Sequence, residues 1–113
     1  MSSAIRIAVC GASGRMGQAL LRLAAPDARL KVIAVVSGRT AVSVAGLPAF
    51  SVSEINNLPD CDVLIDFSQP EAFDTVIDYC RHRKIPLLSG TTGIIERQRQ
   101  QMSELALEVP VLW

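Results

Sequence analysis

The sequence predicts one doubly wound α/β domain, in which helices cover both faces of a parallel sheet. Short aliphatic runs rich in β-branched residues alternate along the 113 residues with amphipathic stretches of helical period. Aromatic residues are scarce, with one Trp, one Tyr and three Phe, while half of the chain is hydrophobic. An aliphatic core of this kind is typical of parallel sheets buried on both faces and disfavours an all-β sandwich.

The first three predicted elements form a βαβ unit. Residues 5–10 alternate between large aliphatic and smaller side chains and predict a strand. A helix is predicted over residues 15–25, ending where Pro26 removes an amide donor. Residues 30–36 are apolar on both parities, so we expect a second strand buried on both faces. The predicted apolar stripe of the helix is Met16, Leu20 and Leu23.

The middle of the chain begins with a predicted loop over residues 37–49, which are small, polar and rich in glycine. A short edge strand over residues 50–52 and a brief helix beginning at Ser53 follow. Residues 63–65 predict a buried strand, and Pro70 suits the first turn of the next helix. The apolar stripe of that helix is Phe73, Val76, Ile77 and Cys80, and its cationic end is Arg81, Arg83 and Lys84.

The last part of the chain repeats the same alternation. We expect a strand over residues 85–88, a helix over residues 96–107 and a strand over residues 109–113. Alternation of this kind predicts a parallel sheet with right-handed crossovers. Ligands of such sheets bind beyond the carboxyl ends of the strands, so the residues that follow each strand are the candidate site.

Composition and charge argue against several classes of function. The 11 Lys and Arg balance the 11 Asp and Glu, which argues against a nucleic-acid or anionic-membrane binder. The three cysteines form no C-x-x-C pair, so neither a disulfide framework nor a zinc site is indicated, and we expect Cys10 and Cys80 to pack as small core residues. With no signal peptide and no run of spanning length, we expect a cytoplasmic protein.

The sequence contains no pattern typical of a catalytic acid, base or metal site. The lone histidine, His82, lies in a basic helix end, Tyr79 has no lysine four residues later, and no serine lies in G-x-S-x-G. No cluster of His, Cys and carboxylates has ligand spacing. We therefore expect this chain to contribute neither a catalytic residue nor a metal site.

A glycine-rich turn after the first strand indicates dinucleotide binding. Its G-x-x-G-x-x-G spacing inside a βαβ unit is typical of Rossmann-like folds, although a purely structural turn is the alternative. Gly11 suits a tight turn, Gly14 leaves room for phosphates, and Gly17 lets the helix pack closely. For Met16 we favour core packing over cofactor contact. The candidate cofactor-binding residues here are Gly11, Ala12, Ser13, Gly14, Arg15, Met16 and Gly17.

The end of the second strand indicates which nicotinamide cofactor is preferred. An acidic residue there would bind both ribose hydroxyls of NAD, but residues 37–40 contain none. Arg39, with the Ser37 and Thr40 hydroxyls, suits a 2′-phosphate instead, so we predict NADPH as the preferred cofactor and NADH as a possible one. The alternative for Arg39 is a solvated loop charge.

Two later strand ends also carry polar residues. Residues 66–71 (DFSQPE) can hold a ligand, but Asp66 can equally cap its helix or satisfy loop amides, and Glu71 suits a helical first turn, so we favour capping. Gly90 to Gly93 read G-T-T-G, and their hydroxyls and amides can bind a nicotinamide carboxamide or ribose. The candidate cofactor contacts in this loop are Gly90, Thr91 and Thr92.

Three of these motifs, in this order, resemble the N-terminal domain of the dihydrodipicolinate reductase (4-hydroxy-tetrahydrodipicolinate reductase) family. They are residues 9–17 (VCGASGRMG), residues 62–68 (DVLIDFS) with Pro70 and Glu71, and residues 90–93 (GTTG). The resemblance spans essentially the whole chain. It implies a Rossmann-like nucleotide-binding domain whose first motif binds the cofactor pyrophosphate and whose G-T-T-G loop lies against the nicotinamide.

The resemblance also implies an activity and a missing part. Family members transfer a hydride from NAD(P)H to an unsaturated dicarboxylate in lysine (diaminopimelate) biosynthesis and assemble as homo-oligomers. Their acid and arginine after the second strand are here reduced to Arg39. The family continues beyond a strand like residues 111–113 into a substrate domain that carries the catalytic residues. We therefore expect residues 1–113 to be an NAD(P)-binding domain or fragment that is inactive alone.

Two other functions remain open on the sequence. One is a non-catalytic dinucleotide-sensing module, which explains the missing acid and base without a second domain. The other is the cofactor domain of a different two-domain oxidoreductase, such as an amino-acid or sugar dehydrogenase. The G-T-T-G loop favours the reductase over this second possibility, and the length of the native reading frame would distinguish the reductase from the sensing module.

Overall fold

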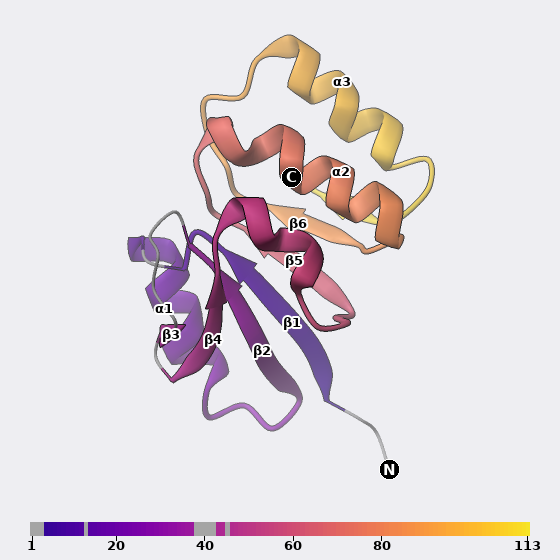
Figure 1. The fold of residues 1–113 in the computed structure, drawn as a ribbon. Coiled ribbons are helices and arrows are strands. Elements are labelled where there is room, and N and C mark those ends of the chain that lie inside the picture. The colour runs from indigo at the N-terminus through magenta and orange to yellow at the C-terminus, as the bar shows by residue number, and fades with distance from the viewer. Residues whose placement is uncertain (1–3, 13, 38–42, 45) are drawn as a thin grey trace.

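The computed structural model describes residues 4–12, 14–37, 43–44 and 46–113, and it confirms the predicted α/β fold. Figure 1 shows the elements in chain order from indigo to yellow. The strands are β1 (Ile5–Cys10), β2 (Leu30–Val36), β3 (Ser43–Val44), β4 (Leu47–Phe50), β5 (Val63–Asp66), β6 (Leu87–Ser89) and β7 (Val111–Leu112). The helices are α1 (Arg15–Ala24), α2 (Phe73–Arg83) and α3 (Glu96–Leu105), with 3-10 turns η1 (Val52–Asn57) and η2 (Pro70–Ala72).

The strands form one sheet of order β3-β4-β2-β1-β5-β6-β7. All neighbours from β4 to β7 pair in parallel, and β3 pairs with β4 antiparallel. Counted in chain order, the six parallel strands therefore have the order 3-2-1-4-5-6 of a Rossmann sheet. The order reverses between β1 and β5, and this switch point is where such sheets bind their ligands.

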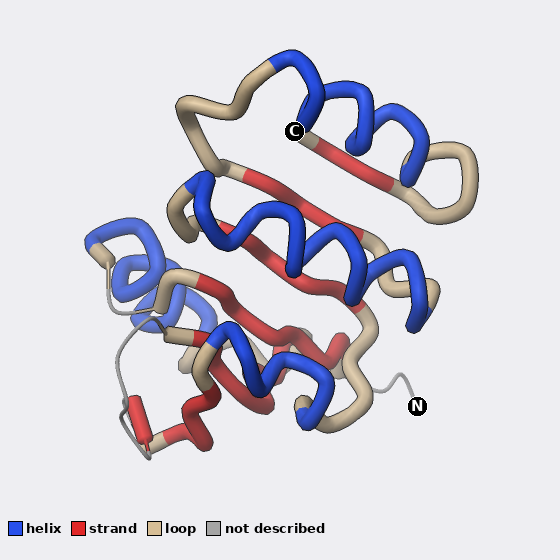
Figure 2. The backbone as a smooth tube through the Cα atoms, turned by 45° about the horizontal axis from the view of Figure 1, so that its top comes forward, coloured by secondary structure: helices blue, strands red, loops and turns tan. Residues whose placement is uncertain are grey.

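Helical layers lie on both faces of the sheet. Alternate residues of β1 enter two separate clusters: Ala8 and Cys10 pack with α2, α3 and η1, whereas Ile7 and Val9 pack with Leu21 of α1. Because successive strand residues point to opposite faces, α1 covers one face and the other helices cover the opposite one. Figure 2 shows α3, α2 and η1 side by side on their shared face. None of the helices in the described part of the chain has the length and apolar content needed to cross a bilayer.

The predicted core-facing stripe of α1 is wrong at Met16 and Leu23, whereas Leu20 packs against the core as predicted. The helix buries Gly17, Leu21 and Ala24, while Met16 and Leu23 are 61% and 76% exposed. The cause is the close packing of the helix against the preceding turn. A Cβ built on Gly17 would lie 2.3 Å from the Gly11 carbonyl oxygen. Because the two backbones are in contact, the helix face that contains Gly17 points to the core and Met16 points to solvent. The spacing of apolar residues in the sequence gives no sign of this contact.

The predicted loop over residues 37–49 is also corrected. β4 begins at Leu47 and ends at Phe50, three residues ahead of the predicted edge strand, and β3 pairs along its outer side. Small residues and Pro48 conceal the strand in the sequence. Its place is set by β2, because the Ser37 amide donates to the Phe50 carbonyl oxygen at 2.8 Å.

The second half of the chain follows the predictions closely. The apolar stripe of α2 is buried, and Lys84 ends the helix with a left-handed φ of 56°. Elements differ from their predicted bounds by two residues or fewer, with α3 ending at Leu105 and β6 beginning at Leu87. Cys10 and Cys80 are buried core residues as predicted, and Cys61 is buried with them.

The close packing of α1 leads to a stability prediction. We expect Gly17→Ala to lower the free energy of unfolding by about 2 kcal/mol, because the added Cβ would overlap backbone atoms of the turn. This cost exceeds the gain in helix propensity, which is about 1 kcal/mol. Urea denaturation measures the difference.

Gly14→Ala is the matched control for this substitution. Its Cβ would meet only the Gly11 carbonyl oxygen, at 3.4 Å, so we expect a loss below about 1 kcal/mol. Equal free energies of unfolding for the two variants would show that α1 does not pack closely against the turn at Gly17.

Candidate functional site

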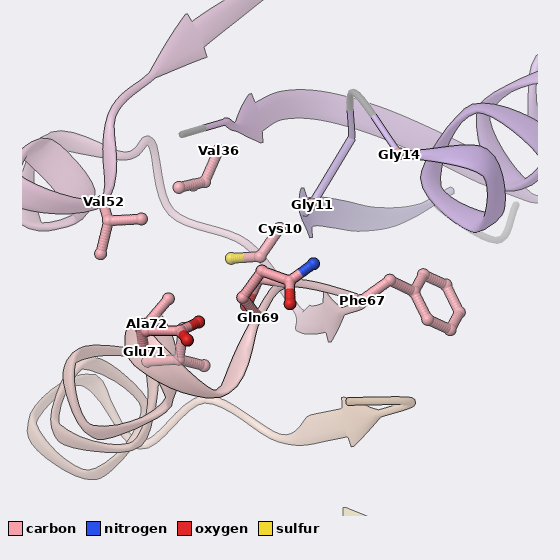
Figure 3. Close-up of a pocket in the computed structure, with 11 residues that line it drawn as sticks. Cys10, Gly11, Gly14, Val36, Val52, Phe67, Gln69, Glu71 and Ala72 are labelled. Atoms are coloured by element: carbon pink, nitrogen blue, oxygen red, sulfur yellow. The ribbon is translucent and has the colours of Figure 1, made fainter. Parts of the chain in front are cut away.

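A cavity of about 550 Å³ lies at the carboxyl ends of β1, β2 and β5. Cys10 and Val36, the last residues of β1 and β2, form part of its wall together with Gly11 and Gly14. Residues from the segment after β5 form the opposite wall (Figure 3). The cavity therefore lies at the switch point of the sheet, where an α/β fold of this order binds ligands.

The glycine turn is built as a tight connection between β1 and α1. Gly11 has φ of 77°, and a Cβ on it would lie 2.6 Å from the carbonyl group of Phe67. Its amide donates to the Val36 carbonyl oxygen at 2.9 Å. The positive φ and the close contact with Phe67 thus explain why residue 11 is glycine, and the close packing of α1 against the turn explains why residue 17 is glycine.

Gly14 differs from these two glycines because protein packing leaves room for a side chain there. Among the described residues packed around it, a Cβ on Gly14 would meet only the Gly11 carbonyl oxygen, at 3.4 Å, and its φ of −79° suits any residue. Gly14 borders the cavity. A glycine at this position keeps the cavity wide beside the helix, which is the space that a phosphate group needs.

The N-terminus of α1 offers hydrogen-bond donors to that space. The first intrahelical bond runs from the Gln18 amide to the Gly14 carbonyl oxygen at 3.0 Å, and no side chain of the described residues caps the helix. The first turn contains no acidic residue, and Arg15 is exposed there. The helix therefore presents backbone amides and positive potential, a combination that binds anions. Ser13, also predicted to contact the cofactor, lies outside the described residues.

One end of the cavity has an apolar wall that the sequence analysis did not single out. Val36, Val52, Ala72 and Val76 come from β2, η1, η2 and α2, and a flat heterocyclic base fits between aliphatic walls of this kind. Two polar side chains border them. Figure 3 shows the Gln69 amide reaching toward Gly11, and Glu71 and Ala72 lying across the cavity from Val36.

A sequence signal for these residues did exist. Gln69 and Glu71 follow β5 directly, and residues after a parallel strand lie at the ligand-binding edge. Val52 and Val76 could not be found in this way, because their apolar side chains read as core positions whether or not they also line a cavity.

The strand end predicted to select the cofactor is partly described. Ser37 is buried and donates its amide to Phe50 across the sheet. Arg39 and Thr40 lie outside the described residues. Their predicted contacts with a 2′-phosphate therefore stay predictions.

Asp66 does not cap a helix, which corrects the preferred interpretation of the sequence. The N-cap position of η2 is Gln69, and no side chain makes a capping bond there. Asp66 is instead fully buried at the end of β5. Its carboxylate accepts bonds from the Ser68 amide at 2.9 Å, from the Ser68 hydroxyl, and from the Thr91 hydroxyl at 3.0 Å. Of the two non-capping possibilities, Asp66 satisfies a loop amide.

The G-T-T-G loop lies next to this carboxylate. Thr91 is half-buried and Thr92 is exposed. A Cβ on Gly90 would lie 2.4 Å from the Phe67 ring, so the ring lies directly against this exposed glycine, and Gly93 has φ of 77°. The loops after β5 and β6 therefore contact each other through both apolar and polar groups.

The ionisable side chains among the described lining residues of the cavity are Glu71 and Cys10. Burial, aided by the nearby Asp66, raises the pKa of the Cys10 thiol well above its ordinary value, so the thiol stays protonated and unreactive. His82 is exposed at the far end of α2, where its Nδ1 lies 2.9 Å from the Asp78 carbonyl oxygen. The described residues of the site can thus bind and orient a ligand.

Comparison with known proteins agrees with this geometry. Residues 5–113 match the family profile described as "Dihydrodipicolinate reductase, N-terminus". The 4-hydroxy-tetrahydrodipicolinate reductase of Xanthomonas euvesicatoria pv. vesicatoria (strain 85-10) is 45% identical over 99% of this chain and 48% of its own length. That of Stenotrophomonas maltophilia (strain R551-3) is 48% identical over 96% of this chain and 47% of its own length. The chain spans about half the length of these curated relatives.

Solved structures support the fold. A dipicolinate-bound dihydrodipicolinate reductase from Paenisporosarcina sp. TG-14 superposes with a TM-score of 0.75 at 23% identity, over 91% of this chain and 43% of that one. A putative NADPH-dependent oxidoreductase from Desulfitobacterium hafniense superposes with a TM-score of 0.79 at 14% identity, over 99% of this chain and 35% of that one. Structural likeness at such identities shows the shared fold, whereas the profile match shows the family. The chain belongs to the dihydrodipicolinate reductase family, of which it forms the nucleotide-binding N-terminal domain.

Proposed function

We propose that the chain binds NADPH, and NADH less tightly, as the cofactor half of a 4-hydroxy-tetrahydrodipicolinate reductase of lysine biosynthesis. The observation that carries the proposal is Gly14: the protein leaves room for a side chain there, yet the position beside the cavity and the uncapped α1 is glycine. An anionic ligand explains both features. A purely structural glycine turn explains Gly11 and Gly17 but not Gly14.

The cofactor would lie across the switch point. Its pyrophosphate would meet the amides at the start of α1, and its adenosine half would follow the apolar wall toward the end of β2. The nicotinamide half would lie toward β5 and β6, where Phe67 and the G-T-T-G loop form the edge of the sheet. Bound NADPH supplies the hydride, and the residues of this chain bind and orient it.

The substrate part of the proposal rests on the relatives. They are named as reductases of 4-hydroxy-tetrahydrodipicolinate and are about twice as long as this chain. We therefore place the substrate and the proton donor in a second domain, with this chain presenting the nicotinamide to it.

Gly14→Val tests the binding site. We expect the variant to lose measurable NADPH binding, because the branched side chain would occupy the space beside the helix N-terminus. Its urea midpoint should stay near that of the wild type, since no atom of the described residues packed around this position lies closer than 3.4 Å to the added Cβ. Cofactor fluorescence titration measures binding.

Ala25→Val is the matched control, since it adds the same branched side chain at the exposed opposite end of α1. We expect it to bind NADPH as the wild type does. Unchanged NADPH affinity in a folded Gly14→Val variant would contradict the proposed site.

Arg39→Ala tests the choice of cofactor. A guanidinium that binds the 2′-phosphate adds a charge-assisted contact to NADPH alone, so its removal should weaken NADPH binding about tenfold and leave NADH binding unchanged. Titrations of both cofactors at low salt measure the ratio. Arg22→Ala, an exposed arginine on α1, is the control. Equal losses for NADPH and NADH would exclude a specific 2′-phosphate contact.

A further inference from the structure

Asp66 occupies the centre of the ligand-binding edge without lining the cavity. It is the last residue of β5, and in the sheet it pairs with Cys10 of β1 on one side and Ser89 of β6 on the other. Its side chain is fully buried. A carboxylate in such a place is costly to bury, so its partners indicate its role.

The hydrogen-bond donors that the described residues offer to the carboxylate belong to two loops. One oxygen accepts the Ser68 amide and the Ser68 hydroxyl, and the other accepts the Thr91 hydroxyl at 3.0 Å. The strand ends are already joined by backbone bonds, from the Phe67 amide to Cys10 and from the Gly90 amide to the Asp66 carbonyl oxygen. The Asp66 side chain therefore adds a connection between the loops that the sheet itself does not provide.

The carboxylate also determines which way the two hydroxyls face. A hydroxyl has one proton to donate, and those of Ser68 and Thr91 are donated to Asp66. Toward any other group these hydroxyls can only accept a hydrogen bond. Thr91 therefore presents lone pairs, and a ligand group that meets it must be a donor, such as the N–H of a carboxamide.

We propose that Asp66 is a positioning residue for the nicotinamide half of the cofactor: it joins the loops after β5 and β6 and fixes the Ser68 and Thr91 hydroxyls as acceptors for the carboxamide amino group. This proposal rests on the proposed function. Because a dinucleotide places one mononucleotide on each half of a doubly wound sheet, Asp66 on β5 acts on the nicotinamide half and not on the adenosine half. In this role the predicted contact of Thr91 with the cofactor is one in which the hydroxyl accepts the hydrogen bond.

Asp66→Asn tests the proposal with little change of shape. Asparagine offers an oxygen on one side and an amino group on the other, so it cannot accept all three donors, and its amino group can donate to Thr91. The Thr91 proton would then face the carboxamide amino group, donor against donor. We expect NADPH to bind about tenfold more weakly, with a reduced enhancement of its fluorescence, while 2′,5′-ADP, the adenosine half, binds within a factor of about two of the wild type.

Asp74→Asn is the matched control. It makes the same chemical change on α2, where Asp74 is half-exposed and pairs with Arg97 at 3.4 Å, away from the cavity. We expect wild-type affinity for both ligands. A loss shared equally by NADPH and 2′,5′-ADP in Asp66→Asn would indicate a general structural role and overturn the positioning role, as would an unchanged affinity for NADPH.

A cofactor analogue tests the direction of the hydroxyl bonds. Reduced 3-acetylpyridine adenine dinucleotide phosphate replaces the carboxamide amino group by a methyl group and cannot donate. We expect it to bind the wild type roughly fivefold more weakly than NADPH and to bind Asp66→Asn about as well as NADPH does. The same ratio of affinities in both proteins would overturn the assignment of the hydroxyls as acceptors.

The design separates this proposal from the proposed function. If the folded wild type binds neither NADPH nor 2′,5′-ADP, the proposed function fails and the positioning role fails with it. If the wild type binds both and Asp66→Asn is not selective, only the positioning role fails. If Asp66→Asn does not fold, Thr91→Val removes one of the two hydroxyls at a half-buried position and takes its place. Thr91→Val should bind NADPH more weakly and 2′,5′-ADP as the wild type does, and it should bind the analogue and NADPH with equal affinity. Wild-type affinity for NADPH, or a preserved preference for NADPH over the analogue, would overturn the proposal.

Discussion

The contact between helix α1 and the turn that precedes it governs the rest of the site. Gly17 brings the helix so close to Gly11 that a Cβ would lie 2.3 Å from a carbonyl oxygen, and Gly11 in turn lies against the backbone after β5. These two contacts fix where the helix begins relative to the ends of β1 and β5. The amides at the helix N-terminus therefore face the switch point of the sheet, with Gly14 keeping the space in front of them clear.

The two halves of the site use different physical means. On the β1 side, backbone amides and the helix dipole suit a phosphate. Side chains matter there only if they fill the space that the phosphate would occupy. On the β5 side, a buried carboxylate and two hydroxyls form a polar network whose partners are fixed. Low dielectric strengthens such a network when every member is satisfied. Burial raises the pKa of the Cys10 thiol between them, so this thiol stays protonated and adds no reactivity.

The fold class could be predicted from patterns that can be read along the sequence. These are the alternation of strands and helices, the spacing of the glycines and the order of the motifs. The misplaced face of α1 and the missed β4 have a common cause. Both are set by contacts with other elements: the Gly11 turn decides which face of α1 is buried, and β2 supplies the partner that makes residues 47–50 a strand. The spacing of apolar residues indicates which positions are buried. A helix face buried through Gly17, or a short strand that contains Pro48, has few large apolar residues and is therefore hard to predict in this way.

The sequence by itself determined the class of the domain, the family it resembles and the residues that follow each strand, because period, turn chemistry and spacing are written along the chain. It could place Asp66 at a strand end but could not choose among its roles. The tertiary structure shows that its carboxylate accepts the nearby Ser68 amide and also the hydroxyl of Thr91, 25 residues later, which the parallel pairing of β5 and β6 brings within 3.0 Å. The apolar wall of the cavity was likewise decided only by tertiary structure, because Val36, Val52 and Val76 belong to three separate elements that meet when the sheet and its helices pack together.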